Sequence, residues 1–245
     1  MIIPILLGVV VGFFSGFLGI GGGTILVPTL VFLGYGFKVA SGISVTQMML
    51  SSIFGTFLNY KKGILNLKEG LALGIGGAIG GLLSGIIVKL LPSHILALLF
   101  LTLVIVALLR FYFQLPEGEE KELSPLLMFT IGVGVGTIAI SVGVGGAILI
   151  TPILVGFLRY PLKKSVSLSL LFVVFSSVAG FLSRALMGII DYKLGFTIGV
   201  ASLLGTYIGV KLYHWITPKH HKKFLIVWYI LVLLLMGYKL LKGEV

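Results

Sequence analysis

Apolar runs of about 20 residues follow one another along this 245-residue chain, separated by short polar links. Hydrophobic residues make up 58% of the sequence and charged residues only 10%, whereas soluble domains carry about 25% charged residues. The mean hydropathy is +1.20. A soluble fold of this size has no interior large enough to bury so much apolar surface. The pattern therefore predicts an all-α, polytopic membrane protein.

Ten apolar segments are expected to form helices: 2–18, 24–35, 40–60, 69–91, 94–115, 124–142, 147–158, 164–186, 192–215 and 223–241. Most are long enough to cross about 30 Å of hydrocarbon at about 1.5 Å per residue. The first segment is interpreted as a retained helix and not a signal peptide, because it lacks a basic start and a small-residue cleavage site. No stretch is polar enough for a separate soluble domain, so we expect one membrane domain over residues 1–245.

The net charge of +11 does not point to nucleic acid. The Lys and Arg residues lie mostly between apolar runs, where they set topology and contact lipid headgroups, and no exposed domain is available to bind nucleic acid. The chain contains no cysteine, which excludes disulfides and Cys-ligated metals.

The sequences on either side of an acidic link at 116–123 are similar, which indicates an internal duplication. Residues 19–28 align with residues 143–152, and the alignment continues after a shift of one position. The later matches are Lys38 with Lys163, Ser44 with Ser169, Ser51 with Ser176, Gly70 with Gly195, Gly74 with Gly199 and Gly80 with Gly205. We therefore divide the domain into repeat 1 (1–115), the link and repeat 2 (124–245).

The two repeats are expected to have opposite orientations in the membrane. Residues 2–35 would make about 50 Å of continuous helix, which is too long for one crossing. A hairpin that turns at the glycines of 19–23 and leaves on the side where it entered fits this length better. Each repeat is thus predicted to be a glycine-broken re-entrant helical hairpin followed by three transmembrane helices. The odd number of crossings inverts repeat 2 relative to repeat 1.

The distribution of basic residues supports this threading. With re-entrant hairpins, one side carries Lys61, Lys62, Lys68, Arg110, Lys121, Arg159, Lys163, Lys164, Lys211, Lys219, Lys222 and Lys223. The other side carries Lys38, Lys89, Arg184, Lys193, Lys239 and Lys242. Because cytoplasmic loops are enriched in Lys and Arg, the first side is expected to face the cytoplasm and both termini to lie outside. If the first segments crossed fully, the same residues would divide equally between the two sides.

The two glycine runs, at 19–23 and 143–146, are candidate anion sites. Backbone N–H groups exposed at a helix break must be surrounded by protein or line a wet cavity when they lie at membrane depth. The helices that begin after the breaks offer free N–H donors and about half a positive charge at each N-terminus. In inverted repeats, two such N-termini would meet near the midplane and bind an anion. The predicted site residues from the breaks are Gly21, Gly22, Gly23, Thr24, Gly145, Gly146 and Ala147.

Close helix packing is the alternative role for a glycine in a membrane protein. We expect packing at five glycines of segment 69–91, namely Gly74, Gly76, Gly77, Gly80 and Gly81. For the two runs we favour the site, because packing does not need several consecutive helix breakers followed by Pro28 or Pro152.

Polar side chains on the helix after each break extend the candidate site. Ser44 and Ser51 share one helical face with Gln47 beside them, and Ser169 and Ser176 hold the matching positions in repeat 2. Hydroxyls donate hydrogen bonds to oxyanions at modest desolvation cost. Membrane helices also use hydroxyls to bond to one another, so both roles remain open.

Arg184 is the one arginine well inside an apolar segment. It could attract an anion, or its side chain could extend to the lipid headgroups, because the segment ends within about two turns. We favour the second interpretation. His94 and His214 lie near segment ends and are expected at the interface, since no carboxylate or Cys completes a metal site around them.

No Asp or Glu is expected in the membrane interior, because Glu69 and Asp191 stand where helices begin, so carboxylate proton relays are not expected. The sequence contains no Walker A motif and no H-E-x-x-H motif. We therefore predict no enzyme activity, no catalytic residues, no cofactor and no metal.

Residues 12–23 read GFFSGFLGIGGG and continue to Pro28 and Leu30. This stretch resembles the signature of the sulfite exporter TauE/SafE family, the toluene sulfonate uptake permeases. The second glycine run, the serine-rich helix after it and the two-repeat organisation are similar as well, so the resemblance covers nearly the whole chain. It implies transport of sulfite, sulfonates or other small sulfur or carbon oxyanions across the cytoplasmic membrane. Ala147 stands where the first run has Gly23, so the two half-sites are expected to differ.

The anion site and the resemblance together predict a transporter of small oxyanions that works by alternating access. Its expected partners are a small anionic substrate and the lipid bilayer. A channel-like anion facilitator is the alternative, because no coupling residue is visible, and a membrane accessory subunit without transport activity is a further one. The pattern specifies no oligomeric state.

Overall fold

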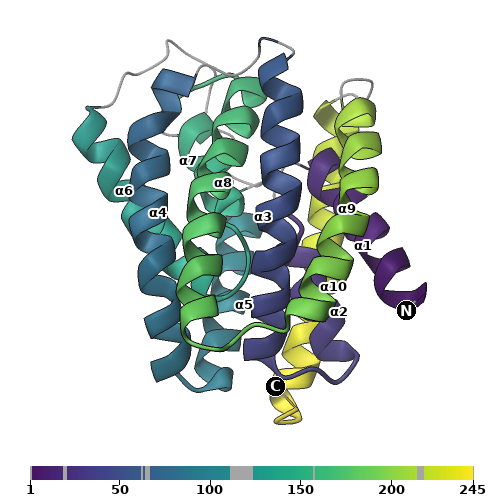
Figure 1. The fold of residues 1–245 in the computed structure, drawn as a ribbon. Helices are drawn as coiled ribbons and strands as arrows, with labels where there is room; N and C mark the ends of the chain where they lie inside the picture. Colours follow the sequence, from purple (N-terminus) through teal and green to yellow (C-terminus); the bar gives the residue numbers. More distant parts are fainter. Residues whose placement is uncertain are drawn as a thin grey trace.

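Ten helices make up the described part of the computed structural model, and no strand lies within that part (Figure 1). The described residues are 2–18, 21–61, 63, 67–110, 124–156, 158–213 and 218–244. The helices are α1 (Ile2–Leu18), α2 (Gly23–Phe32), α3 (Phe37–Lys61), α4 (Leu67–Leu90), α5 (Ser93–Arg110), α6 (Pro125–Ser141), α7 (Ala147–Gly156), α8 (Leu162–Leu186), α9 (Tyr192–Tyr213) and α10 (Pro218–Leu241). The ten expected segments are therefore confirmed as helices. The link at 116–123 lies outside the described residues.

The helices differ in length, and two of them are much shorter than the rest. Three of them contain stretches long and apolar enough to cross a membrane by length and composition, namely Gly70–Leu90, Lys164–Leu186 and Tyr192–Leu212. In contrast, α2 and α7 have 10 residues each. At about 1.5 Å per residue such a helix is about 15 Å long, half of a hydrocarbon core.

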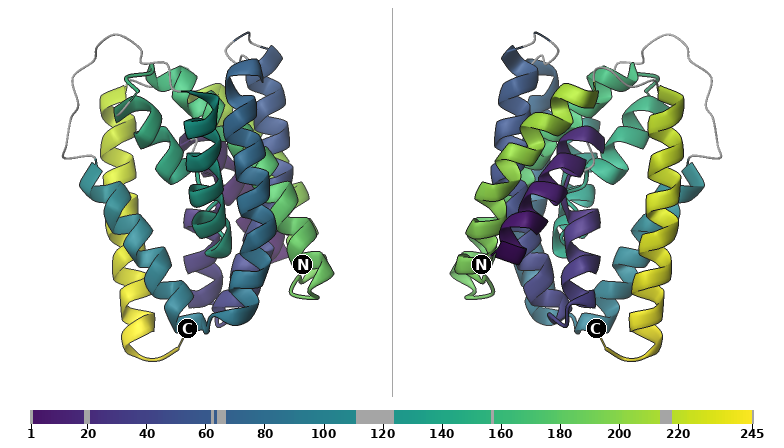
Figure 2. Two further views of the ribbon diagram at one scale, coloured as in Figure 1. Left: turned by 90° about the vertical axis from the view of Figure 1, so that its left-hand side faces the viewer. Right: turned by 90° about the vertical axis from the view of Figure 1, so that its right-hand side faces the viewer.

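Both short helices follow a turn in the chain. In Figure 2, α1 and α2 run in opposite directions, and so do α6 and α7. The helix α2 extends towards the lower end of the molecule, whereas α7 extends towards the upper end. The long helices α3, α4, α8 and α9 pass from one end of the molecule to the other (Figure 1).

Helices of each half of the chain pack mainly against helices of the other half, an arrangement called here the exchange of helices. The first helix of each half packs mainly against the fourth helix of the other half, so that α1 lies on α9 and α6 lies on α4. If each helix is replaced by its equivalent in the other half, the contact of α4 with α8 becomes the contact of α9 with α3. In the same way, the contact of α2 with α3 becomes the contact of α7 with α8. The pairs α3 with α8 and α5 with α10 join equivalent helices. The contact pattern is thus nearly unchanged when the halves are swapped.

Glycines make the exchanged contacts possible. A Cβ atom on Gly12 of α1 would collide with the backbone of Ser202 in α9. In the equivalent pair, a Cβ on Gly136 of α6 would lie 2.8 Å from the carbonyl oxygen of Gly77 in α4. Small residues of this kind let membrane helices approach each other closely, where dispersion contacts and interhelical hydrogen bonds hold them.

The packing role expected for five glycines of α4 is confirmed. A Cβ at each of them would press on a neighbouring helix: on Phe175 at Gly74, Phe129 at Gly76, Phe172 at Gly77, Val133 at Gly80 and Ser176 at Gly81. These neighbours belong to α6 and α8, the two helices between which α4 lies.

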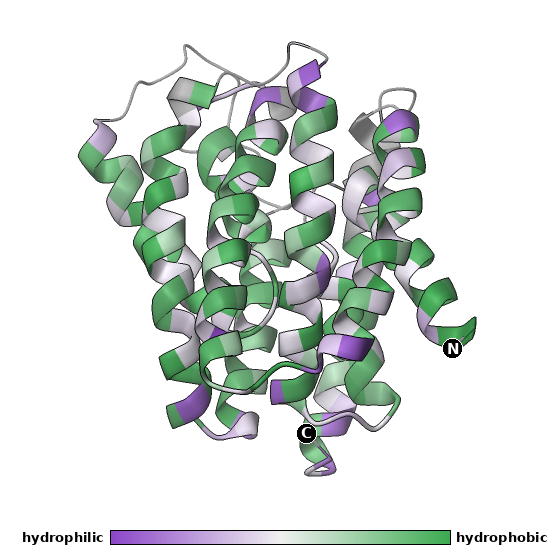
Figure 3. Cartoon of the chain, viewed as in Figure 1, coloured by the Kyte–Doolittle hydropathy of each residue, from purple (hydrophilic) through white to green (hydrophobic). Residues whose placement is uncertain are grey.

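The outer surface is apolar and the ends are polar. Figure 3 shows hydrophobic residues along the length of the helices and hydrophilic residues gathered near the upper and lower ends. Large side chains such as Val200, Leu204 and Leu234 are 59%, 68% and 69% exposed. Hydroxyls, in contrast, are buried on the central helices α3 and α8. This arrangement suits lipid as the surrounding solvent.

Candidate functional site

Glycine conformations form the two breaks. Gly21, just before α2, has φ 75°. In the second break Gly143, Gly145 and Gly146 have φ values of 77°, 80° and 79°. This left-handed region is accessible to glycine at little cost, so the glycine runs end α1 and α6 and allow the chain to turn back. Residues 19–20 of the first break lie outside the described residues.

The two breaks lie against each other in the interior. A Cβ on Gly23 would collide with the carbonyl oxygen of Gly143, and a Cβ on Gly21 would lie 3.5 Å from the carbonyl oxygen of Val144. Ser44 of α3 ties them together, because its hydroxyl donates a 2.7 Å hydrogen bond to the carbonyl of Gly143. The glycines are needed here because a side chain would separate the breaks.

Each short helix begins with uncommitted backbone donors. In α2, the first amides bonded to the backbone are those of Ile25 and Leu26, which donate to the carbonyl of Gly22. The amides of Gly23 and Thr24 have no acceptor among the described residues. In α7 the carbonyl of Gly146 likewise accepts from the third and fourth residues of the helix. Unpaired N–H groups and the helix dipole make both positions favourable for an anion.

Unpaired side-chain atoms gather at the start of α2. Gln47 and Thr24 are both 0% exposed. The Oγ1 of Thr24 and both the Oε1 and the Nε2 of Gln47 lack a hydrogen-bond partner within the described part of the chain. The carboxamide of Gln47 lies directly against the N-cap residue of α2, because a Cβ on Gly22 would collide with its Oε1. Buried polar atoms normally find partners, so these three are an exception at a site predicted to hold a ligand.

The second break is more enclosed by apolar side chains. A Cβ on Gly145 would lie 2.6 Å from the sulfur of Met48, and one on Gly146 would collide with the ring of Phe172. Ala147, the first residue of α7, is fully buried. The two half-sites therefore differ, as the sequence suggests.

The predicted serines have different surroundings. Ser169 shares a 2.8 Å hydrogen bond with the hydroxyl of Thr151, which joins α8 to α7. The hydroxyls of Ser51 and Ser176 are 3.4 Å from carbonyls of their own helices, at the long limit for such bonds. The backbone of Ser176 is also part of the contact with Gly81 of α4. Ser44 is the predicted serine that touches both breaks.

Arg184 does not extend to the lipid headgroups, so the favoured sequence interpretation is wrong. Its side chain is 0% exposed. The Nη2 atom donates to the carbonyls of Ile140 and Ser141, at 2.5 and 3.0 Å, and Nη1 donates to the hydroxyl of Ser41 at 3.0 Å. The first two acceptors end α6, immediately before the second break. The carbonyl of Ile140 also accepts from the amide of Gly143, whereas Arg184 is the donor to the carbonyl of Ser141 among the described residues. The guanidinium therefore caps the end of α6 and neutralises the negative end of its dipole.

A family model described as sulfite exporter TauE/SafE matches residues 4–236 of the chain. The chain belongs to the sulfite exporter TauE/SafE family.

Relatives of this TauE/SafE protein have compatible descriptions. A probable membrane transporter protein of Methanocaldococcus jannaschii is 27% identical over 242 residues, which cover 90% of each chain. The probable membrane transporter protein YunE of Bacillus subtilis is 25% identical over 268 residues, covering 98% of this chain and 97% of its own. No solved structure matches the chain. The family is one of membrane transporters, which implies that this member is not an enzyme.

Two further residues of the TauE/SafE protein contact the breaks without having been predicted as site residues. The sulfur of Met48 would lie 3.5 Å from a Cβ atom added to Gly21 and 2.6 Å from one added to Gly145. Met48 therefore lies between the two breaks. Ser41 contacts both Arg184 and Gly143. Met48 lies one residue after Gln47, and Ser41 lies one turn before Ser44. Their positions next to predicted site residues on the same helix could have indicated that both contact the breaks.

Proposed function

We propose that this protein transports small oxyanions, such as sulfite or an organosulfonate, across the membrane by alternating access. The observation that carries the proposal is the cluster of unpaired, fully buried polar atoms of Thr24 and Gln47 at the start of α2. Family membership makes transport the activity to explain.

The chemistry of the cluster favours an anion. The amides of Gly23 and Thr24, which have no acceptor among the described residues, are hydrogen-bond donors. The hydroxyl of Thr24 and the Nε2 of Gln47 are donors as well, and the N-terminus of α2 adds a partial positive charge. The helices that form the breaks, α2, α3 and α7, contain no Asp or Glu that would attract a cation. A site of this kind binds a dehydrated anion without a permanent charge beside it, which also allows release.

Alternating access is proposed on the basis of inverted repeats. The exchange of helices between halves and the opposite directions of the matched pairs, α3 with α8 and α4 with α9, support this organisation (Figures 1 and 2). In such transporters the substrate lies where two discontinuous helices meet, and one repeat rocks against the other around it. The contacts between Gly21, Gly23 and the second break fit this scheme.

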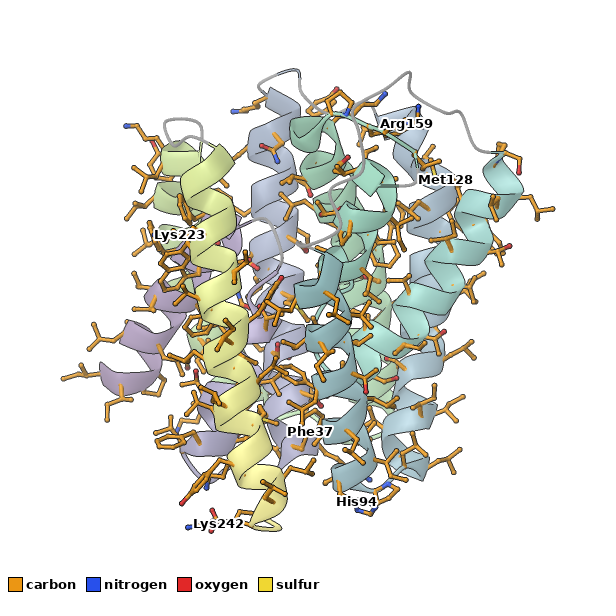
Figure 4. All side chains as sticks on the ribbon, turned by 180° about the vertical axis from the view of Figure 1, so that it is seen from behind. Phe37, His94, Met128, Arg159, Lys223 and Lys242 are labelled. Atoms are coloured by element: carbon orange, nitrogen blue, oxygen red, sulfur yellow. The ribbon has the colours of Figure 1, made fainter. Side chains whose placement is uncertain are left out.

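We further propose that the protein resides in the cytoplasmic membrane with both termini outside. Figure 4 supports two polar ends, with Arg159 near the upper end and His94 and Lys242 near the lower end. The upper end would then be the cytoplasmic one, because threading the chain with re-entrant hairpins assigns the larger share of Lys and Arg to the side that carries Arg159.

The test is transport by the purified protein in liposomes loaded or bathed with sulfite. We expect saturable sulfite flux that is lost in Gln47→Met and in Thr24→Val, because each substitution removes polar atoms without a large change in volume. Thr29→Val is the matched control for Thr24, since the hydroxyl of Thr29 lies in the same helix and already donates to the carbonyl of Ile25. Wild-type flux in both site variants would contradict the proposal. Single-channel currents would favour a channel-like facilitator, and absence of any flux would favour an accessory subunit.

A further inference from the structure

We propose that the site at the start of α2 accepts a singly charged oxyanion that also carries a hydrogen-bond donor, such as a hydroxyl group, and discriminates against ions that only accept hydrogen bonds. The inference rests on the proposed function, because it narrows the substrate class of the same site. The decisive feature is the side chain of Gln47, whose two polar atoms are both buried and unpaired.

A carboxamide has two opposite requirements. Its NH₂ group donates and its oxygen accepts, and this holds whichever way the amide of Gln47 is turned. An ion with acceptor oxygens alone satisfies the donor and leaves the Oε1 of Gln47 facing another negative oxygen. A ligand that offers one O–H or N–H group satisfies both atoms.

The neighbouring groups do not satisfy the oxygen of Gln47. The hydroxyl of Ser44 directs its hydrogen to the carbonyl of Gly143, and the amides of Gly23 and Thr24 form no hydrogen bond to Gln47 in the described part of the chain. A buried site that must hydrogen-bond a hydroxyl rejects analogues that lack it much more strongly than an apolar pocket rejects a change in size. Gln47 is therefore in a position to set specificity.

The charge of the site fits one negative charge better than two. The cationic side chain of Arg184 contacts the second break, and its terminal nitrogens are already bonded to Ser41, Ile140 and Ser141. Helix N-termini supply only about half a charge each. The cost of taking an ion out of water rises steeply with its charge, so a dianion such as sulfate lacks adequate compensation here.

The hydrogen must be carried by the ligand. Among the described residues, the acidic side chains outside the masked positions are Asp191, which precedes α9, and Glu244, which follows α10. Neither lies within a helix, so no carboxyl group of the described interior can share a proton with the bound ion. A hydroxyl or amino group of the substrate itself supplies the donor.

Matched ligand pairs test this inference on the full, unmodified chain in detergent. The first pair is 2-hydroxyethanesulfonate and propane-1-sulfonate, which have the same charge and number of non-hydrogen atoms but exchange a hydroxyl for a methyl group. Hydrogencarbonate and acetate form a smaller pair with the same exchange. Using isothermal calorimetry, we expect the hydroxyl member of a pair that binds to have a Kd at least about 10-fold lower. In Gln47→Met this preference should disappear.

The outcomes separate this inference from the proposed function. Equal affinities within the pairs, or binding of sulfate without binding of either hydroxyl member, would overturn the donor requirement and leave oxyanion transport intact. A preference that persists in Gln47→Met would overturn the role of Gln47. Failure of every oxyanion to bind would instead remove the proposed function. The comparison on the unmodified chain does not depend on the folding of a variant.

Discussion

Gln47 and Thr24 hold polar atoms where burial is costly. Their unpaired atoms lie in a region that is 0% exposed, and nothing in the described fold compensates them. A buried polar group without a partner costs about 1–3 kcal/mol. Such a cost is tolerated where a ligand supplies the missing partner, so function and stability are expected to conflict at these two residues.

Replacement of Gln47 by Met should therefore stabilise the ligand-free protein while removing transport. Met has a similar length and no hydrogen-bonding requirement, so the free energy of unfolding should rise by about 1–3 kcal/mol. The melting temperature of the purified protein in detergent reports this change. Thr29→Val should show little gain, because the hydroxyl of Thr29 is bonded within its helix. A lower melting temperature for Gln47→Met would mean that ordered water pairs the carboxamide.

Arg184 is expected to be a structural residue of the second break. In Arg184→Met the carbonyl of Ser141 loses its donor, at a cost of about 1–3 kcal/mol for a buried group left unpaired, whereas the carbonyl of Ile140 keeps the amide of Gly143. The melting temperature should fall clearly, whereas Arg159→Met, at an exposed position, should leave it nearly unchanged. Equal melting temperatures for the two variants would show that the capping bonds contribute little.

The local sequence gave the wrong interpretation of Arg184 for a physical reason. Its distance from the end of the segment allowed the side chain to reach the headgroups. The acceptors that keep it inside lie in α6 and α3, far away along the chain, and only the tertiary fold brings them together. Gln47 shows the opposite case, since the helical face next to the glycine run placed it correctly beside the break.

At the scale of the elements, the helices themselves could be predicted because the surrounding solvent imposes their length. Apolar runs and glycine breaks located all ten, including the short α2 and α7. The partner of each helix could not be predicted in the same way. The packing of α1 on α9 and of α6 on α4 depends on matching glycine surfaces that lie in different repeats.

Those glycine surfaces can be tested within a single helix. Gly136 of α6 is buried against the backbone of Gly77, whereas Gly134, two residues earlier, has open space around it. Gly136→Ala should lower the melting temperature, because the helices must separate to admit the methyl group. Gly134→Ala should stabilise the helix by up to about 1 kcal/mol, since alanine is the better helix former. Equal effects of the two substitutions would contradict the assigned packing of α4 and α6.

For the whole molecule, the orientation of the repeats can be measured directly because the chain contains no cysteine. Single cysteines at Lys61 and Arg159, both exposed, should react with an impermeant thiol reagent only from the cytoplasmic side. A cysteine at the exposed Lys193 should react only from outside. Labelling of the first two positions from opposite sides would exclude inverted hairpins and would leave the fold of the helices unaffected.

The exchange of helices between the halves also has a consequence for biosynthesis. The helix α1 is made long before α9, its main packing partner, because seven helices separate them along the chain. Until then the glycine surface of α1 has no matching helix and faces lipid or the insertion machinery. A chain released early would expose that surface permanently, which would mark it for membrane proteases. The first helix therefore gains its main packing partner only after most of the second half has been made.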